Sequence, residues 1–324
     1  MKKRTFRDFI GVGILFIILC TSPNSSWAAV EKYPSHAIDL FCAHGAGGQT
    51  DLCNRALARG LEKYLGVTVV PGNKTGGGGV VATTSLINSR PDGYTMALLG
   101  FNVVTALVLG QGNYSLDDLT IVGQFATFPG ALSTSADSPW KTFQEFIDYA
   151  RKNPGVKYAH PGVGSSIYMR MENLNKNANL KMVGVPFKSD PEIIAAILGK
   201  HVPVGIGGLM AAKDQADAGK MRILLSFDPP AEVGLDPTIP CIRTAFDKTV
   251  SDKDLEIVVF LAVPRKTPKE IVQLLEQTLE KVTKDPEFIN DLKKLYMKAS
   301  YLDSKKATDN LFKIMVQVKA IVKE

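Results

Sequence analysis

The chain has 324 residues, 45% of them hydrophobic, and a formal net charge of +6 at pH 7. Lysine and arginine form no run with interleaved aromatic residues, so nucleic acid is not indicated as a partner. The length suggests two domains with a substantial core and excludes a small disulfide-bonded domain.

The N-terminus has the pattern of a secretory signal peptide. Four cationic residues among the first seven precede an apolar run from Phe9 to Cys20, and Ala28 and Ala29 offer small residues for cleavage. The run is short of the roughly 20 residues that span a bilayer, so we predict removal of residues 1–29; a retained anchor is the alternative. The net charge then falls to about +3, because four cations leave with Asp8. Outside the cytosol, a small carboxylate is a better candidate ligand than a nucleotide cofactor.

An apolar strand is predicted from Ala37 to Cys42, and a glycine turn at 44–51 leads into a helix. Apolar residues recur in this helix near helical spacing and predict one buried face: Cys53, Leu57, Leu61 and Leu65. Free N–H groups at a helix start, with the macrodipole behind them, bind anions, and glycine lets a ligand approach the backbone. The turn is therefore a candidate carboxylate site; glycines that serve only a tight turn are the alternative.

Two further loops share this design. Residues 73–79 also open a helix, and residues 160–166 repeat the arrangement in the other half of the chain. Neither of the first two loops completes a phosphate-loop or dinucleotide-binding motif, so a nucleotide site is not favoured. Ser165 and Ser166 could cap the following helix or donate hydroxyls to a ligand, and capping is the commoner role for one of them. Three amide-rich helix starts facing one cleft would bind a carboxylate without a buried ion pair.

Short strands and helices alternate through the rest of the chain. A helix is expected over Gly79–Asn88, and from Thr267 onward the pattern is wholly helical. The expected strands are Thr68–Pro71, Thr95–Leu99, Lys157–His160, Met182–Val185, Val202–Ile206, Met221–Leu225 and Ile257–Val263. This alternation predicts βαβ units and a parallel sheet, in two similar α/β halves joined by an apolar strand. Ligands of such sheets bind at the carboxyl ends of the strands.

No catalytic or metal-binding constellation is apparent. Ser138–Lys141 and Lys74–Gly76 match two motifs of penicillin-recognising enzymes, but in reversed order and without the Ser-Asp-Asn element between them. The histidines show no metal-ligand spacing, so neither a metal nor a cofactor is expected: His36, His44, His160 and His201. Cys42 and Cys53 flank the first glycine turn and could form a disulfide, or could be buried small hydrophobes.

Several short motifs, in order, resemble those of the substrate-binding proteins of tripartite tricarboxylate transporters, the Bug family of periplasmic solute-binding proteins. Residues 46–51 are similar to the family's Ala-Gly-Gly-Gly-Thr-Asp, and residues 73–79 resemble its Asn-Arg-Pro-Gly-Ala-Gly-Gly. Residues 91–95 are identical to its Pro-Asp-Gly-Tyr-Thr turn, residues 158–166 resemble its Tyr-Ala-Ser-Ser-Gly-x-Gly-Thr-Ser, and residues 185–188 resemble its Val-Pro-Tyr-Lys. The resemblance runs from Tyr33 to the C-terminal helix.

The resemblance implies an α/β, two-lobed, type II-like periplasmic binding fold with a ligand cleft between two doubly wound α/β domains. The expected limits are 1–29 for the signal peptide, 30–127 plus 256–324 for the first lobe and 128–255 for the second. The implied protein is a monomer without enzymatic activity that captures a small carboxylate and delivers it to integral membrane transporter subunits. A carboxylate sensor for a membrane receptor and a secreted hydrolase are the alternatives.

The family pattern also implies ligand-binding residues. Main-chain N–H groups of the first and third loops would hold the carboxylate, while Asp51 would stabilise the helix start and the segments at Phe101 and Phe187 would line the far end. His44 and Tyr168 stand where the family has other residues; His44 could contact the ligand or point outward. The predicted set is His44, Gly47, Gly48, Gln49, Thr50, Asp51, Phe101, Asn102, Gly164, Ser165, Ser166, Tyr168, Phe187 and Lys188. Phe101 suggests a more apolar distal pocket, and Pro203 and Gly207-Gly208 lack the polar groups of the family.

Overall fold

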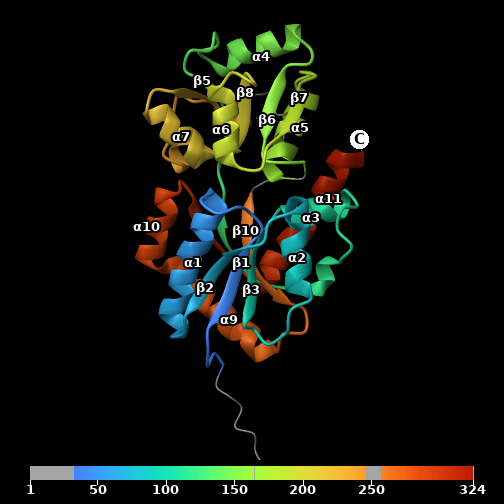
Figure 1. Cartoon of the computed structure of the whole chain (residues 1–324), viewed down its shortest axis with the longest axis vertical. Coiled ribbons are helices and arrows are strands. Elements are labelled where there is room, and N and C mark those ends of the chain that lie inside the picture. The colour runs from blue at the N-terminus through green and yellow to red at the C-terminus, as the bar shows by residue number, and fades with distance from the viewer. Residues whose placement is uncertain (1–32, 164, 246–256, 324) are drawn as a thin grey trace, which may run out of the picture. The chain divides into compact units, whose positions relative to one another are not determined.

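The strands form two sheets in the computed structural model, which describes residues 33–163, 165–245 and 257–323 (Figure 1). The first sheet has the order β11-β4-β10-β3-β1-β2 and the second has the order β7-β6-β8-β5-β9. The first contains β1 (Ile38–Cys42), β2 (Val69–Asn73), β3 (Thr95–Gly100), β4 (Leu119–Thr127), β10 (Val258–Pro264) and β11 (Lys298–Asp303). The second contains β5 (Gly130–Ser135), β6 (Lys157–His160), β7 (Val183–Pro186), β8 (Val204–Gly208) and β9 (Met221–Ser226).

Helices separate most of these strands along the chain. They are α1 (Gln49–Leu65), α2 (Val80–Ile87), α3 (Asn102–Val108), α4 (Phe143–Lys152), α5 (Ser166–Asn177), α6 (Asp190–Leu198), α7 (Leu209–Asp217), α8 (Ile242–Ala245), α9 (Lys269–Lys284), α10 (Pro286–Lys294) and α11 (Ser304–Lys323). Short 3₁₀ turns lie at Gly77–Gly79, Leu116–Asp118 and Pro230–Glu232. The strands and helices predicted from the sequence are confirmed to within a few residues, and Lys157–His160 has the predicted bounds.

Both sheets share one topology. In each, a β-α-β-α-β unit supplies three parallel strands: β1, β2 and β3 in the first sheet, and β6, β7 and β8 in the second. A strand from a distant part of the chain then pairs antiparallel with the third of these, β10 with β3 and β5 with β8. The predicted βαβ units with parallel strands are confirmed, and each sheet is mixed because antiparallel strands are added to them. The chain crosses between the sheets at the edge where the parallel strands end. The strands that follow these crossings, β5 and β10, therefore run antiparallel to β8 and β3.

The expectation of a wholly helical segment after Thr267 was wrong, because β11 pairs antiparallel with β4 at the sheet edge. All but the first of its six residues are half-buried, and its alternation of lysine, small and apolar residues resembles that of the neighbouring helices.

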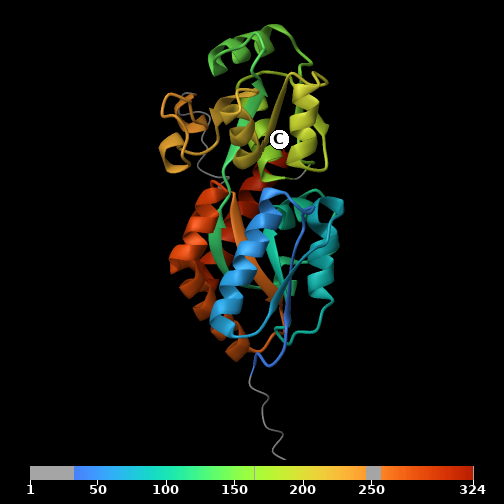
Figure 2. The ribbon, with the colours of Figure 1, turned by 60° about the vertical axis from the view of Figure 1, so that its left-hand side comes forward.

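The two faces of the first sheet bury different helices because successive side chains of a strand point to opposite faces. Ile38, Leu40 and Cys42 of β1 pack in one cluster with α1, α9 and α10, while Phe41 packs in another with α2, α3 and α11. Figure 2 shows the sheet between the orange-red helices α9 and α10 and the teal helix α2. The predicted apolar face of α1 is confirmed, since Cys53, Leu57 and Leu61 are fully buried.

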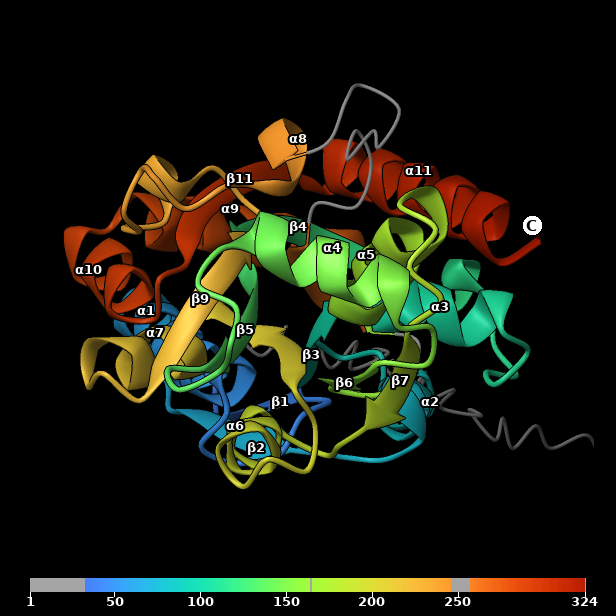
Figure 3. The same cartoon turned by 90° about the horizontal axis from the view of Figure 1, so that it is seen from above.

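The second sheet is covered in the same way. Tyr158 of β6 packs with α4 and α5, and its neighbour Ala159 packs with α6 on the opposite face. Seen from above in Figure 3, the second sheet runs between α4 and α5 on one side and α6 and α7 on the other.

The chain passes between the sheets at two adjacent points. Phe128 and Pro129 connect β4 to β5, and Ile257 leads back into β10. The Phe128 N–H donates to the Ile257 carbonyl at 2.7 Å, so the two passages lie side by side (Figure 1). Residues Tyr33–Glu324 form one compact unit.

Cys42 and Cys53 are buried and are not joined in a disulfide, and burial raises the pKa of Cys42. Within the part of the chain that the structure describes, no helix combines the length and the apolar character needed to cross a bilayer. The predicted signal peptide lies outside the described residues.

Candidate functional site

A pocket of about 1120 Å³ lies where the parallel strands of both sheets end. Its lining follows β1 (residues 43–46 and 50), β2 (75–81), β3 (100–102), β6 (161–163 and 165–167), β7 (188–190 and 192) and β8 (208). Phe128 and Ile257, from the two crossing passages, complete the wall. The pocket therefore has the position that the α/β pattern predicted.

Five helices of eight or more residues begin beside this pocket. Each contributes lining residues from its cap or first turn: Thr50 of α1, Gly79 before α2, Ser165 before α5, Ser189 before α6 and Gly208 before α7. The N-terminal ends carry partial positive charge and N–H groups without intrahelical acceptors. Helix N-termini that follow strands of both sheets therefore favour an anion in the pocket.

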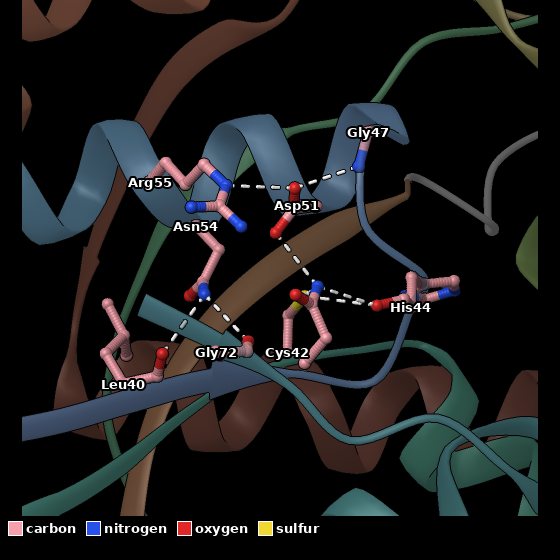
Figure 4. Close-up of polar contacts among 9 residues, drawn as sticks. Leu40, Cys42, His44, Gly47, Asp51, Asn54, Arg55 and Gly72 are labelled. Atoms are coloured by element: carbon pink, nitrogen blue, oxygen red, sulfur yellow. Dashed lines mark hydrogen bonds and ion pairs between the residues drawn. The ribbon is translucent and has the colours of Figure 1, made fainter. Parts of the chain in front are cut away.

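The first glycine loop is held in shape by Asp51 (Figure 4). This buried carboxylate accepts hydrogen bonds from Gly47 N at 3.0 Å, Arg55 Nε at 3.0 Å and Asn73 Nδ2 at 2.9 Å. Burial raises its pKa, but these bonds outweigh burial and hold the pKa of Asp51 below its usual value. Asp51 therefore holds the first glycine loop in place, and the Gly47 N–H group donates its hydrogen bond to Asp51.

The second loop brings its backbone close to Asn102. Four successive glycines, 76–79, have positive φ angles, which side chains other than glycine rarely adopt. Asn102 is 8% exposed, and its Oδ1 accepts from Gly100 N at 3.2 Å. Its Nδ2 is buried without a hydrogen-bond partner although the residue lines the pocket. An unpaired buried donor is costly, so this amide is a candidate donor to a bound oxygen atom.

The third loop separates the roles of its two serines. The Ser165 side chain accepts from Tyr168 N at 3.2 Å and caps α5. Ser166 is 7% exposed and lines the pocket, and its hydroxyl makes no hydrogen bond to another described residue. Ser166 is therefore the serine available to a ligand.

The pocket does not attract anions through net charge. Among its described lining residues, Lys188 carries the one lysine or arginine charge, against the carboxylates of Asp190 and Glu192. His44 also lines the pocket, with part of its surface open to solvent. Desolvation by the surrounding protein lowers the pKa of His44. A bound carboxylate would be held by hydrogen bonds and helix dipoles.

The predicted site residues divide into three groups. Those that line the pocket are His44, Thr50, Phe101, Asn102, Ser165, Ser166 and Lys188. Those on the same loops or helices but outside the lining are Gly47, Gly48, Gln49, Asp51, Tyr168 and Phe187. Gly164 lies outside the described residues. Asp190 was missed, although Ser189-Asp190-Pro191 after a strand is a recognisable helix start.

Two α/β lobes of like topology that share one pocket define a two-lobed, type II-like solute-binding fold. The family model described as "Tripartite tricarboxylate transporter family receptor" (TctC) matches residues 53–324, and the chain belongs to this family. The resemblance seen in the sequence motifs is thereby confirmed.

Known proteins agree with this assignment. The chain is 28% identical to the "UPF0065 protein in gbd 5'region" of Cupriavidus necator, over 100% of this chain and 98% of the relative. It shares its fold with MatC (Rpa3494) of Rhodopseudomonas palustris, solved with bound malate: 21% identity, 90% of this chain, 100% of that chain, TM-score 0.77. It also shares its fold with R. palustris Rpa4515, solved with adipate: 22% identity, 90% and 97% coverage, TM-score 0.80.

Proposed function

We propose that this protein is a periplasmic solute-binding protein that captures a small organic carboxylate and delivers it to a tripartite tricarboxylate-type membrane transporter. The role is non-catalytic: the protein releases its ligand unchanged. Residues 1–29 would direct export and be removed. The lobes would comprise residues 30–127 with 256–324, and residues 128–255.

The observation that carries the proposal is the set of helix starts from both sheets around one pocket, with the unpaired Asn102 Nδ2 among them. A carboxylate offers two acceptor oxygens and one negative charge, so it satisfies this donor and the helix dipoles together. Malate and adipate, bound by the two R. palustris proteins of the same fold, have this chemistry.

The proposal includes closure of the lobes over the ligand. The cavity of about 1120 Å³ exceeds the upper end of the usual range for ligand pockets, roughly 1,000 Å³, and a small acid fills only part of it. A ligand that contacts both lobes binds more tightly when they approach, so it shifts the population toward the closed form. The adjacent passages at Phe128 and Ile257 would serve as the hinge.

The test is calorimetry and thermal unfolding of the exported protein, refolded to remove resident ligand. Malate, adipate and other carboxylates are compared with the corresponding amides. At about 100-fold excess over Kd, a ligand adds about 2.7 kcal/mol to the free energy of unfolding. Binding that disappears with the amide supports a carboxylate receptor, and a smaller radius of gyration with ligand supports closure. A folded protein that binds none of the carboxylates contradicts the proposal.

A further inference from the structure

One carboxylate in the pocket wall retains an unused oxygen. Asp190, the first residue of α6, is half-buried and lines the pocket. Its Oδ1 accepts from Gly208 N at 3.1 Å, while Oδ2 accepts no hydrogen bond from a described residue. Burial raises the pKa of Asp190 to about 6, against the lowering effect of the Gly208 bond. At neutral pH the group is thus mostly ionised, in a pocket otherwise suited to anions.

A second acceptor without a donor lies next to it. Gln49 is 2% exposed, and its Nε2 donates to the Leu295 carbonyl at 2.5 Å. That bond fixes the orientation of the amide, because a carbonyl requires a donor. Gln49 Oε1 is consequently directed away from Leu295, and it is buried without a partner.

Gly208 brings the two oxygens together. A Cβ on Gly208 would stand 2.3 Å from Gln49 Oε1 and 2.9 Å from Asp190 Oδ2. Both acceptors therefore crowd the same side of one backbone position at the pocket, a position that only glycine can occupy without a clash. Two adjacent acceptor oxygens with no donor between them form an electronegative spot.

The charged groups around this spot do not neutralise it. Lys188, two residues from Asp190, is the one lysine or arginine among the described lining residues, and it forms no ion pair with Asp190. Glu192, two residues further along α6, adds a carboxylate whose Oε2 accepts from Lys188 N at 3.0 Å. A second carboxylate of a ligand would meet repulsion here, whereas a cationic donor would meet an ionised acceptor.

We propose that Asp190 is a specificity-determining residue, and that it selects a ligand bearing an ammonium group as well as a carboxylate. This inference rests on the proposed function and names the substrate class of the same pocket. The ligand carboxylate occupies the donor side, at Asn102 Nδ2 and Ser166. The ammonium group donates to Asp190 Oδ2, and the partial charge on Gln49 Oε1 adds to the attraction.

The test uses a series of unbranched acids of three to six carbons that differ only in the terminal group. Each ω-amino acid is compared with the ω-hydroxy acid, the dicarboxylate and the unsubstituted acid by calorimetry at pH 7.5 with the refolded exported protein. We expect the best amino acid to bind at least tenfold more tightly than the dicarboxylate of similar length. The hydroxy acid should fall between them, because it donates a hydrogen bond without charge.

Two variants locate the preference. Asp190→Asn keeps the acceptor for Gly208 N and removes the charge, so it should weaken amino-acid binding at least tenfold and strengthen dicarboxylate binding. Asp214→Asn is the matched control, since it makes the same chemical change at an exposed residue of α7 outside the pocket lining. The control should change the ratio of the two affinities less than threefold.

Three results would overturn the inference. They are tighter binding of dicarboxylates than of amino acids by the natural protein, no binding of any amino acid, or an equal change of the ratio in both variants. The natural protein alone gives the first two, so the test does not depend on how a variant folds. Dicarboxylate binding without amino-acid binding would contradict this inference and leave the proposed function intact. If no acid binds, both the inference and the proposed function are contradicted.

Discussion

The side-chain nitrogen of Asn102 occupies the space that a Cβ on Gly79 would need: the distance would be 1.7 Å. Gly79 precedes α2 and has a φ of 102°, so glycine is required there both for backbone conformation and for space. The second glycine loop and the start of α3 are thereby fitted to each other.

Replacing Gly79 by alanine should displace the Asn102 amide. We expect a loss of about 1–3 kcal/mol in the free energy of unfolding, from the left-handed backbone and the displaced side chain. Carboxylate affinity should fall about tenfold, since one hydrogen bond contributes roughly 1.4 kcal/mol. Gly110→Ala is the control: Gly110 has a φ of 68° and open space around it. Equal binding by both variants would contradict a role for the Asn102 amide.

Changing Asn102 to aspartate tests the donor directly. The new side chain can still accept from Gly100 N, but it presents an anion where the amide presented a donor. We expect carboxylate affinity to fall by about 100-fold, measured by calorimetry. Asn88→Asp makes the same chemical change at an exposed residue and should leave binding unchanged. If Asn102→Asp binds as well as the natural protein, the donor lies elsewhere.

The two serines at the start of α5 should respond in opposite ways. Ser165→Ala removes the cap and should reduce the free energy of unfolding by about 1 kcal/mol. Ser166→Ala should leave stability nearly unchanged and weaken carboxylate binding, because its hydroxyl has no described protein partner. Chemical denaturation measures the free energy of unfolding of each variant, and calorimetry measures its carboxylate affinity. The assignment fails if Ser165→Ala produces the larger loss of affinity.

Asp190 should make the stability depend on pH. Its pKa rises from 3.8 to about 6 on folding, so the native state holds a proton more tightly than the unfolded chain does. Stability from this group is therefore greatest below pH 4, declines as the pH rises to about 6 and stays low above it. Asp190→Asn should stabilise the ligand-free protein at pH 8, by up to about 3 kcal/mol, and have little effect at pH 3.5. A constant difference between the two proteins across this range would contradict the expected titration.

His44 should couple carboxylate binding to protonation. The protein lowers the pKa of this ring, and a carboxylate beside it would favour the charged form. Affinity should therefore rise as the pH falls from 8 to 5.5, and His44→Phe should flatten the profile. Both proteins would carry Asp190→Asn, so that the second titrating group is absent. His201→Gln, at an exposed position outside the pocket lining, should retain the slope; a slope retained by His44→Phe would separate the ring from the ligand.

Local sequence patterns predicted most of the fold because short-range rules decide most strands and helix starts. The β-α-β-α-β units and the glycine loops follow from periodicity and turn residues. The antiparallel β10 and the edge strand β11 depend instead on which distant strands they join, and a local pattern does not contain that information.

The residues of the candidate site also divide into those that a local pattern predicts and those that depend on distant contacts. His44, Thr50, Asn102 and Ser166 follow strand ends, so the loop pattern brought them to the pocket. The position of Gln49 depends on a hydrogen bond to Leu295, 246 residues away in sequence. No spacing rule predicts such a bond, whereas Asp190 lies at a helix start that the sequence does indicate.

Because Phe128 and Ile257 are hydrogen-bonded to each other, the chain enters and leaves the second lobe at neighbouring points. The first sheet is closed across this insertion by the pairing of β4 with β10. The half of the pocket that the second sheet contributes is therefore built on one insertion between β4 and β10, two strands that remain paired with each other.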